Sequence, residues 1–407
     1  MARSKRLRPT HEAATPPVET IIVGAGVAGL ACARHLHDAG NPFLVISENV
    51  GGRVQRSGDG AVNLGAYYVR ADYTNVNRYV RLGRRIDRLT PQRHDGGSSY
   101  GLWDRRLLLH LPQAGRFLRL LVEFKRHYGD FQQRCVTMGQ PAAIRADPLL
   151  LRLYHQPAQA FIDQHRLRHL ARWYLTPWLL GTAFAPLHAM TAFPLLLGAL
   201  PLLVPTYEFT LKTDLLIDGF ADSIVADTVI GVGLRGSSYV VETSAGSMIA
   251  KRVVIATPTD RAGQLLSFAA GKRPVSAHMY QIDGVLRDAY NGADIHLVAG
   301  DDTVLAIARQ ANGSILLCSR LHPPDFDRFL TEWRVIDHKH WNPAFHILGN
   351  DLIECEQGPN LYLIGDHNIV GLEDAYLTGL YAANRIIAGA AGLEPHNRAV
   401  LAAQSRT

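Results

Sequence analysis

The segment that most constrains this chain lies near its N-terminus, where the apolar run VETIIV is followed at once by GAGVAG. Glycines spaced as GxGxxG between a strand and a helix are typical of a turn that holds a dinucleotide pyrophosphate. Gly24 permits the tight turn, Gly26 lets the backbone approach the phosphates, and Gly29 lets helix and strand pack closely. The following helix adds amide donors and the positive end of its dipole. Residues 18–47 therefore predict a β-α-β unit whose cofactor-binding positions are Gly24, Gly26, Val27, Ala28 and Gly29.

The second strand of this unit raises a question about the ribose contact. An acidic residue is expected about 20 positions after the glycines, but Ser47 stands there and Glu48 follows one step later. Neighbouring strand side chains point to opposite faces, so Glu48 cannot simply replace a carboxylate at position 47. If position 47 is still strand, the Ser47 hydroxyl makes a weaker contact; if the strand ends early, Glu48 turns back to the ribose, which we favour. One charge-assisted bond of roughly 1.5–3 kcal/mol is at stake, which weakens the site without abolishing it.

The rest of the chain divides into helical and strand-rich stretches. Helical patterns are predicted from about 75 to 205, including 116–131 and 158–181. The later elements are predicted to be a hairpin formed by 238–246 and 252–258, a mixed segment at 275–345, a strand at 361–366 and a last helix at 372–389.

The most apolar stretch, residues 184–205, is interrupted by four prolines and one histidine. A membrane-spanning helix needs about 20 uninterrupted apolar residues, so the pattern does not predict a span. Two readings stay open. The stretch forms buried packing helices, or it lines a tunnel for a lipophilic substrate or touches a membrane surface.

The charge of the chain excludes few partners. Of its 407 residues, 42 are Lys or Arg and 36 are Asp or Glu, and four of the basic groups lie within the first ten positions. The body is thus only slightly basic, which does not predict a nucleic-acid partner. Residues 1–17 read as a disordered basic tail without a signal-peptide core, and 393–407 as a C-terminal tail. Four scattered cysteines are typical of reduced thiols, so we expect a cytoplasmic protein, with a peripheral membrane contact left open.

Three further motifs carry a resemblance to a known family. GGR (51–53) follows the second strand, NLGAYYV (63–69) comes soon after, and LYLIGD (361–366) precedes the last helix. In this order they resemble the FAD-dependent amine oxidase and phytoene desaturase superfamily. The resemblance covers the first 70 and last 50 residues well, is looser at 217–220 and 252–258, and implies bound FAD.

The resemblance assigns roles to individual residues. Gly52 and Arg53 would approach the phosphates, Arg53 as a planar fork of donors. Asp366 would accept hydrogen bonds from ribityl or ribose hydroxyls, with Gly365 keeping the backbone low. The N-terminus of the last helix, with Asp374 and Ala375, would face the flavin, although Asp374 also fits an ordinary first-turn helix acid. Val229 matches, loosely, the position whose backbone pairs with adenine.

The chain departs from the amine oxidases at positions that bear on chemistry. Gly371 replaces an aromatic of the amine cage, and the strand at 275–285 carries Ala277 and His278 where a lysine near flavin N5 is common. No cysteine stands where a covalent flavin link is expected, so the resemblance implies noncovalent FAD. These departures favour a desaturase or a dehydrogenase of hydrophobic substrates, because the cofactor carries the hydride step.

Catalytic residues are not identified by the sequence. Tyr67, Tyr68 and Trp341 are candidates for the substrate pocket wall and equally for packed core aromatics. The candidate acid–base groups, none of them favoured, are His278, His338, His340 and His346. No metal site is predicted, because HKH (338–340) places two imidazoles on one strand face but supplies no third ligand.

The predicted fold class is mixed α/β, with a Rossmann-like FAD-binding domain interleaved with a helical and sheet-containing substrate domain. The FAD domain would use 18–75, 207–270 and 347–392, and the substrate domain 76–206 and 271–346. The predicted function is an FAD-dependent oxidoreductase that takes hydride from a largely apolar small molecule. The alternatives are a peroxide-producing amine oxidase, a non-enzymatic lipid- or protein-binding module like the Rab GDP-dissociation inhibitors, and a nicotinamide-dependent dehydrogenase, which would leave the C-terminal motif unexplained. The oligomeric state is not predicted.

Overall fold

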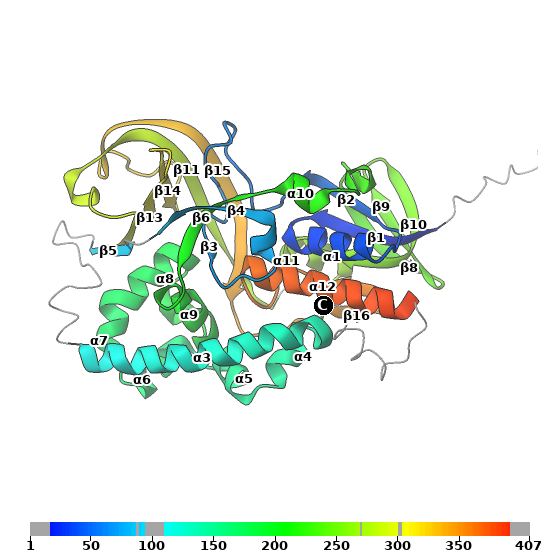
Figure 1. Cartoon of the computed structure of the whole chain (residues 1–407), viewed down its shortest axis with the longest axis horizontal. Helices are drawn as coiled ribbons and strands as arrows, with labels where there is room; N and C mark the ends of the chain where they lie inside the picture. The colour runs from blue at the N-terminus through cyan, green and yellow to red at the C-terminus, as the bar shows by residue number, and fades with distance from the viewer. Residues whose placement is uncertain (1–16, 87–88, 94–109, 269–270, 300–302, 391–407) are drawn as a thin grey trace, which may run out of the picture.

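The computed structural model describes residues 17–86, 89–93, 110–268, 271–299 and 303–390. Both predicted tails lie outside these residues, apart from position 17. Two sheets and a helical layer form the body, with the largest sheet at one end and the helices along one side (Figure 1). No helix in this described part of the chain combines the length and the apolarity that a membrane crossing requires.

The first sheet has eight strands and carries the predicted dinucleotide unit. Its parallel core runs in the order β17-β10-β1-β2-β7, so β1 lies in the middle. A hairpin is present, but its second arm was predicted too late in the sequence: β9 pairs antiparallel with residues 246–250 of β10, whereas 252–255 pair in parallel with β1 and β17. The strands are β1 (Val18–Ala25), β2 (Leu44–Val50), β7 (Ile224–Val225), β8 (Val229–Arg235), β9 (Ser238–Thr243), β10 (Gly246–Ile255), β16 (Glu356–Gly358) and β17 (Leu361–Leu363).

Helix α1 (Val27–Asp38) packs against the last helix, α12 (Leu372–Ala390), although some 340 positions separate them. Glycines make the close approach physically feasible. A Cβ on Gly379 would lie 2.3 Å from the Ala28 carbonyl oxygen, and a Cβ on Gly29 would lie 2.0 Å from the Gly24 oxygen. The two ends of the chain are therefore joined beside the glycine-rich turn.

The second sheet has six strands in the order β15-β11-β14-β13-β12-β5. Its members are β5 (Leu89–Arg93), β11 (Arg273–Leu286), β12 (Ile295–Ala299), β13 (Val304–Arg309), β14 (Ile315–Ser319) and β15 (Leu330–Leu348). A small third sheet joins β3 (Val69–Arg70), β6 (Thr206–Leu211) and β4 (Val80–Arg85) in the order β3-β6-β4. The prediction that helix begins near position 75 is therefore wrong, because 80–85 and 89–93 pair in sheets.

The helical layer begins with α3 (Leu111–Met138), which contains the predicted helix at 116–131. The predicted helix at 158–181 is broken after Gln164, where α6 ends; helix resumes at Arg168 and continues through a π-helical turn (Ala171–Leu175) into α8. The other α-helices are α4 (Gln140–Arg145), α5 (Pro148–His155), α6 (Ala158–Gln164), α7 (Arg168–Leu170), α8 (Thr176–Ala183), α9 (Ala192–Ala199), α10 (Thr213–Ile217) and α11 (Thr259–Leu266). The 3₁₀ turns are Val76–Tyr79, Leu187–Ala189, Leu200–Leu202, Ala221–Ser223 and Asp288–Tyr290.

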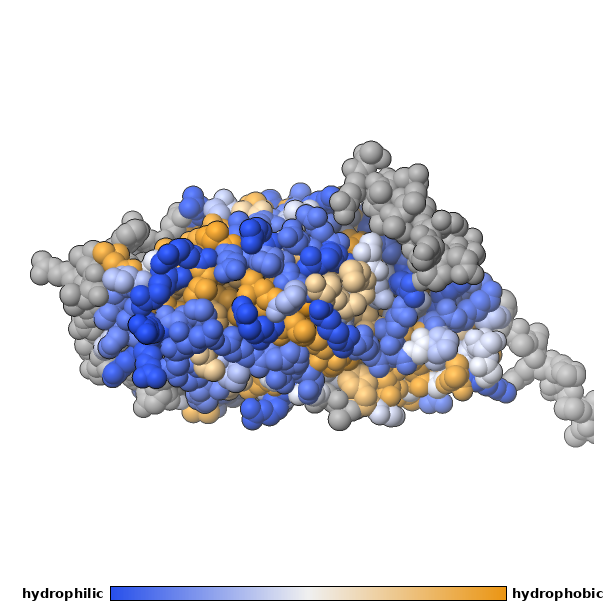
Figure 2. Space-filling model, turned by 90° about the horizontal axis from the view of Figure 1, so that it is seen from below, coloured by the Kyte–Doolittle hydropathy of each residue, from blue (hydrophilic) through white to orange (hydrophobic). Residues whose placement is uncertain are grey.

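The apolar stretch at 184–205 supplies core, since Phe193 and Leu195 are fully buried. The underside of the molecule carries a band of hydrophobic residues bordered by hydrophilic ones (Figure 2). On α3, Leu118 and Val122 are exposed. A membrane contact stays a prediction.

Candidate functional site

A cavity of about 570 Å³ lies between the two large sheets. One part is lined by the β1–α1 turn, the end of β2, 256–258 and 365–375. The other part is lined by residues of the helical layer and of β11 and β15. The first and last segments of the chain therefore meet at one cleft, which continues into an apolar lobe.

The glycine-rich turn is shaped to admit a ligand. Gly24 has φ +107°, and a Cβ there would lie 2.9 Å from the Ala256 carbonyl oxygen. Apart from its chain neighbours and its own helix, no atom of the described residues lies within 4 Å of a Cβ built on Gly26. Gly26 itself lines the cavity. Gly26 also caps α1 without a side-chain hydrogen bond from any described residue, so the first amides of the helix stay available. These residues fit the pyrophosphate of a dinucleotide.

A bulge in β2 explains the irregular spacing between the glycine-rich turn and Glu48. β2 continues to Val50, but Ile46 pairs with Val23 while Val50 pairs with Ala25, so β2 bulges between these positions. The bulge breaks the alternation of side chains, and both Ser47 and Glu48 line the cavity. Ser47 donates to the Asn49 carbonyl at 2.8 Å, and Glu48 accepts from Thr228 at 3.0 Å. The argument that only one of the two can face the cleft is therefore wrong, and the ribose ligand stays a prediction.

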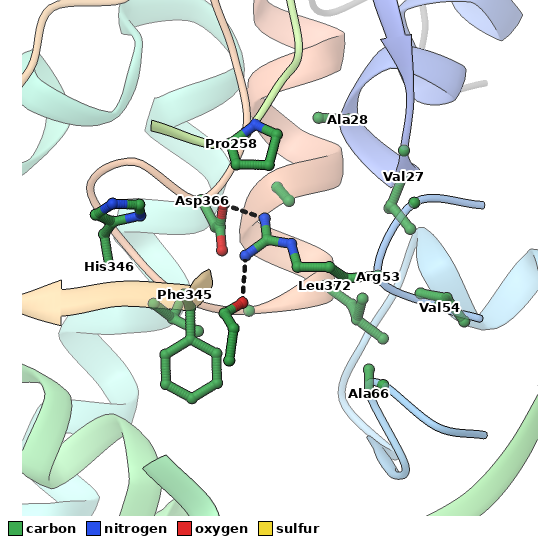
Figure 3. Close-up of a pocket in the computed structure, with 18 of the residues that line it drawn as sticks. Val27, Ala28, Arg53, Val54, Ala66, Pro258, Phe345, His346, Asp366 and Leu372 are labelled. Carbon is green, nitrogen blue, oxygen red and sulfur yellow. Dashed lines mark hydrogen bonds and ion pairs between the residues drawn. The ribbon is translucent and has the colours of Figure 1, made fainter. Parts of the chain in front are cut away.

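Arg53 and Asp366 form an ion pair at the centre of the cavity wall (Figure 3). Nη2 of Arg53 donates to Asp366 at 2.6 Å, and Nη1 donates to the Ala344 carbonyl at 2.8 Å. Burial would raise the pKa of Asp366, but the charge and hydrogen bond of Arg53 lower it below its ordinary value. The carboxylate is thus ionised and can accept hydroxyl donors with its remaining lone pairs. In this structure Arg53 binds Asp366 and a carbonyl, and its predicted phosphate contact stays untested.

The first residues of α12 and the turn before this helix line the cavity. Gly365, Gly52, Ala375 and Leu372 belong to the lining. Asp374 does not: it is 1% exposed, and both its oxygens accept from the Tyr128 hydroxyl, at 2.7 and 2.6 Å. The expectation that Asp374 contacts the cofactor is corrected, because its side chain points into the helical layer instead. Burial raises the pKa of Asp374 to about 7 against the opposing effect of Tyr128.

Val229 lines the cavity, and its predicted backbone contact with adenine stays a prediction. Its carbonyl accepts from Nη2 of Arg261 at 2.6 Å. Val27 and Ala28, at the start of α1, line the cavity too.

The second lobe is walled mainly by aromatic and aliphatic side chains. Tyr67 and Tyr68 stand edge to face with ring centroids 5.1 Å apart, and Trp341 donates to the Leu64 carbonyl. All three predicted pocket residues belong to the lining, and Tyr67 also belongs to the core. From the apolar stretch, Phe184, Phe193 and Leu197 reach the same lobe, so this stretch is at once core and cavity wall.

A lysine in the cavity was missed by sequence reasoning. Lys272 precedes β11 by one residue, is 5% exposed and lines the cavity. Its Nζ donates to the Asn368 carbonyl and lies 4.8 Å from the centroid of the Tyr154 ring. Burial lowers the pKa of Lys272 to about 7, against the opposing charges of Asp366 and Asp351. Only tertiary structure could identify it, because the position expected for a lysine lies further along the strand.

Arg70 was also missed. It is 4% exposed, lines the cavity, and donates through Nε to Asp72 at 2.9 Å. Its guanidinium lies over the Tyr73 ring, 4.9 Å from the centroid. Among the described residues, its Nη2 has no hydrogen-bond acceptor. A buried donor without a partner is costly, so Nη2 is available to an oxygen acceptor of a ligand or of water.

Of the candidate acid–base histidines, only His346 lines the cavity. It is 4% exposed, and burial lowers its pKa. His278, His338 and His340 lie on the opposite face of β11 and β15 from Met279, Lys339 and Trp341, which line the cavity. They are therefore removed from the candidate catalytic residues.

The fold contains a Rossmann-like domain, and one cavity lies between this domain and the second large sheet with its helices. A family model described as an NAD(P)-binding Rossmann-like domain matches residues 22–81. Protein anon-37Cs of Drosophila melanogaster is 40% identical over 83 residues, which make up 19% of this chain but only 16% of the length of the fly protein.

Solved structures match over nearly the whole chain at low identity. A fatty acid isomerase from P. acnes has a TM-score of 0.68 at 13% identity, covering 90% of this chain and 98% of the isomerase. A double mutant of putrescine oxidase has 0.65 at 15%, covering 91% and 99%, and cyclohexylamine oxidase from Brevibacterium oxydans has 0.64 at 15%, covering 93% and 99%. The resemblance to FAD-dependent amine oxidase-like enzymes is confirmed at the level of the fold.

Proposed function

We propose that this chain is an FAD-dependent oxidoreductase that takes hydride from a largely apolar substrate bearing an acidic group. One observation carries the proposal: a dinucleotide-shaped cleft and an apolar lobe form one continuous cavity. The fold shared with flavin oxidases supports the cofactor. A nicotinamide enzyme would not need the turn at Gly365 and the start of α12 in the same cleft.

Different residues of the cleft would bind different parts of FAD. The first amides of α1 and the backbone at Gly26 would hold the pyrophosphate, and Asp366 would accept from the sugar-alcohol chain. Bound FAD supplies the acceptor for a hydride pair. The aromatic wall at Tyr67, Phe184 and Phe193 excludes water and orients the apolar part of the substrate.

Two cationic side chains would act on the substrate. Lys272, whose pKa of about 7 leaves Nζ partly unprotonated near neutrality, can accept a proton from the carbon or heteroatom that is oxidised. Arg70 would donate from Nη2 to a carboxylate or similar oxyanion at the other end of the substrate. The fatty acid isomerase of similar fold is named for an acidic, apolar substrate, which supports the proposed substrate class.

An amine oxidase is the second candidate, favoured by the likeness to putrescine and cyclohexylamine oxidases. Lys272 places a lysine in the cavity, which removes one argument against an amine oxidase. Gly371 still leaves half of an aromatic cage missing, and a buried guanidinium at Arg70 disfavours a cationic substrate. We therefore rank it below an acidic, apolar substrate.

The test begins with the visible spectrum of the purified full chain and the identity of the nucleotide released on denaturation. The yellow protein is then mixed anaerobically with long-chain carboxylic acids, their methyl esters, polyenes and primary amines. Bleaching of the flavin by the acids in preference to esters and amines is expected. Bleaching by amines alone would establish the amine oxidase reading, and a colourless chain that refuses FAD would favour the binding module.

A further inference from the structure

Imidazoles gather on the outer face of the six-stranded sheet, away from the cavity. β15 places His338 and His340 two residues apart on one face, and β11 places His278 directly opposite His340. On the other side of β11, His278 pairs with Ser319 at the end of β14, and His322 follows three residues later. Three neighbouring strands thus bring together the side chains that the HKH motif alone could not supply.

The ring nitrogens of this cluster lie close enough together to share one ion. One ring nitrogen from each of His278, His322 and His338 lies within 4.8 Å of the others. Nδ1 of His278 and Nε2 of His338 are 3.0 Å apart. Tetrahedral zinc, with Zn–N bonds of about 2.0–2.1 Å, holds two ligand nitrogens roughly 3.4 Å apart. The separation of 3.0 Å is slightly shorter than that value. The rings of His278, His322 and His338 are stacked within 5° to 15° of parallel, so metal binding requires side-chain rotations that aim the three lone pairs at one ion.

The surroundings of the cluster suit a metal ion. The Tyr280 hydroxyl lies 2.7 Å from Nδ1 of His322, where a hydrogen-bond partner can fix the orientation of a ligating ring. The ring of His340 lies parallel to that of His278 with centroids 4.1 Å apart and is the nearest further imidazole. The site is reachable, because His322 is exposed.

We propose that His278, His322 and His338 bind a divalent transition-metal ion of the Zn²⁺ type on the outer face of this sheet. Neutral imidazoles prefer such ions over Mg²⁺ or Ca²⁺, which take oxygen ligands. The ion would fasten the segment after β14 to β11 and β15. This site is separate from the flavin cleft and does not rest on the proposed redox function.

The experiment titrates Zn²⁺ into chelator-treated full-length chain by isothermal calorimetry, with Mg²⁺ as the comparison ion. One Zn²⁺ per chain is expected, and Mg²⁺ should give no saturable heat. Each of His278→Gln, His322→Gln and His338→Gln should weaken Zn²⁺ binding at least ~10-fold. Tyr280→Phe should weaken it by a smaller factor, because it removes only an orienting contact.

The matched control is His169→Gln, which alters another parallel imidazole pair, His110 and His169, with centroids 5.0 Å apart. It should leave the affinity for Zn²⁺ unchanged. Thermal unfolding of the zinc-free variants checks that they fold, and His322→Gln, at an exposed position, is the substitution that perturbs packing least. The proposal is overturned if no saturable Zn²⁺ binding occurs, or if the three variants bind Zn²⁺ as tightly as the control.

Discussion

At the residue scale, Lys272 has the property most closely tied to chemistry. An ammonium 5% exposed beside Tyr154 loses most of its hydration, and burial lowers its pKa to about 7. Lys272→Met should slow flavin reduction by roughly 10²-fold and remove the rise in rate on going from pH 6 to 8. Anaerobic stopped-flow reduction measured across this range checks it. A variant that keeps the rise would assign the titration to another group.

The same lysine predicts a stability change with a defined sign. Its folded pKa is lowered from 10.5 to about 7, so between these values the unfolded chain holds a proton that the folded chain lacks. Stability contributed by this group therefore rises with pH across that window and is lost as pH falls through 7. Urea unfolding of the wild type and of Lys272→Met should give a free-energy difference that shifts in favour of the wild type from pH 7 to 9.5.

Arg70 supplies a prediction about substrate selection. A charge-assisted hydrogen bond contributes roughly 1.5–3 kcal/mol, so Arg70→Met should raise KM for a carboxylic acid about 10- to 100-fold. The methyl ester of the same acid should be affected little. Arg78→Met, at an exposed arginine outside the cavity lining, is the control. Equal losses for acid and ester would show that Arg70 acts on packing and not on the anion.

At the element scale, the contact between α1 and α12 depends on one small residue. A Cβ on Gly379 would also lie 2.9 Å from the Ala31 Cβ and from the Cys32 amide nitrogen. Gly379→Ala should therefore destabilise the chain by ~1–3 kcal/mol and lower its flavin content. On the same helix Gly389 meets no described atom within 4 Å, so Gly389→Ala should stabilise by up to ~1 kcal/mol. Thermal unfolding measures the stability of both variants, and the ratio of flavin to protein absorbance measures their flavin content. Equal changes in stability for Gly379→Ala and Gly389→Ala would contradict the packing argument.

The first turn of α12 also joins the helical layer through Asp374. Its folded pKa, about 7, lies above the unfolded value of 3.8, so its stabilising contribution is present below pH 3.8 and lost as pH rises through 7. Asp374→Asn keeps an acceptor for Tyr128 and removes the titration. The variant should gain stability relative to the wild type on going from pH 5.5 to 8.5, measured by urea unfolding. A pH-independent difference would show that the carboxyl is already ionised at low pH.

Elements with a strong local pattern were predictable and those set by distant contacts were not. The β-α-β unit predicted at 18–47 and the last helix have clear periodicity or turn residues, and both are confirmed; the hairpin was predicted, but its turn lies between Thr243 and Gly246 and not between 246 and 252. The strand at 80–85 was misread as helix, because its partner, β6, lies about 125 residues away. The bulge of β2 and the position of Lys272 likewise depend on tertiary packing, so no local pattern signals them.

At the scale of the whole molecule, the cofactor cleft is assembled from segments that lie far apart in the sequence. Gly26, Arg53, Ala256 and Asp366 come from four separate stretches of the chain and line one cavity. A ligand that binds this cleft binds only the folded chain, so mass action must raise the stability of every segment together. The same reasoning explains why the glycine-rich turn and Arg53 were predictable but the contact of Arg53 with the Ala344 carbonyl was not, since only the fold brings these two residues together.

This coupling predicts a thermal shift that discriminates between cofactors. FAD added to flavin-depleted chain at 100 times its Kd should stabilise the fold by about 2.7 kcal/mol and raise Tm by several degrees in a single transition. NADH or NADPH at the same concentration should shift Tm little, because neither carries an isoalloxazine to reach the Arg53–Asp366 pair and the start of α12. Asp366→Asn should reduce the FAD shift, since a neutral amide leaves Arg53 without its charged partner. A larger shift with NADPH than with FAD would overturn the flavin assignment and leave the fold unchanged.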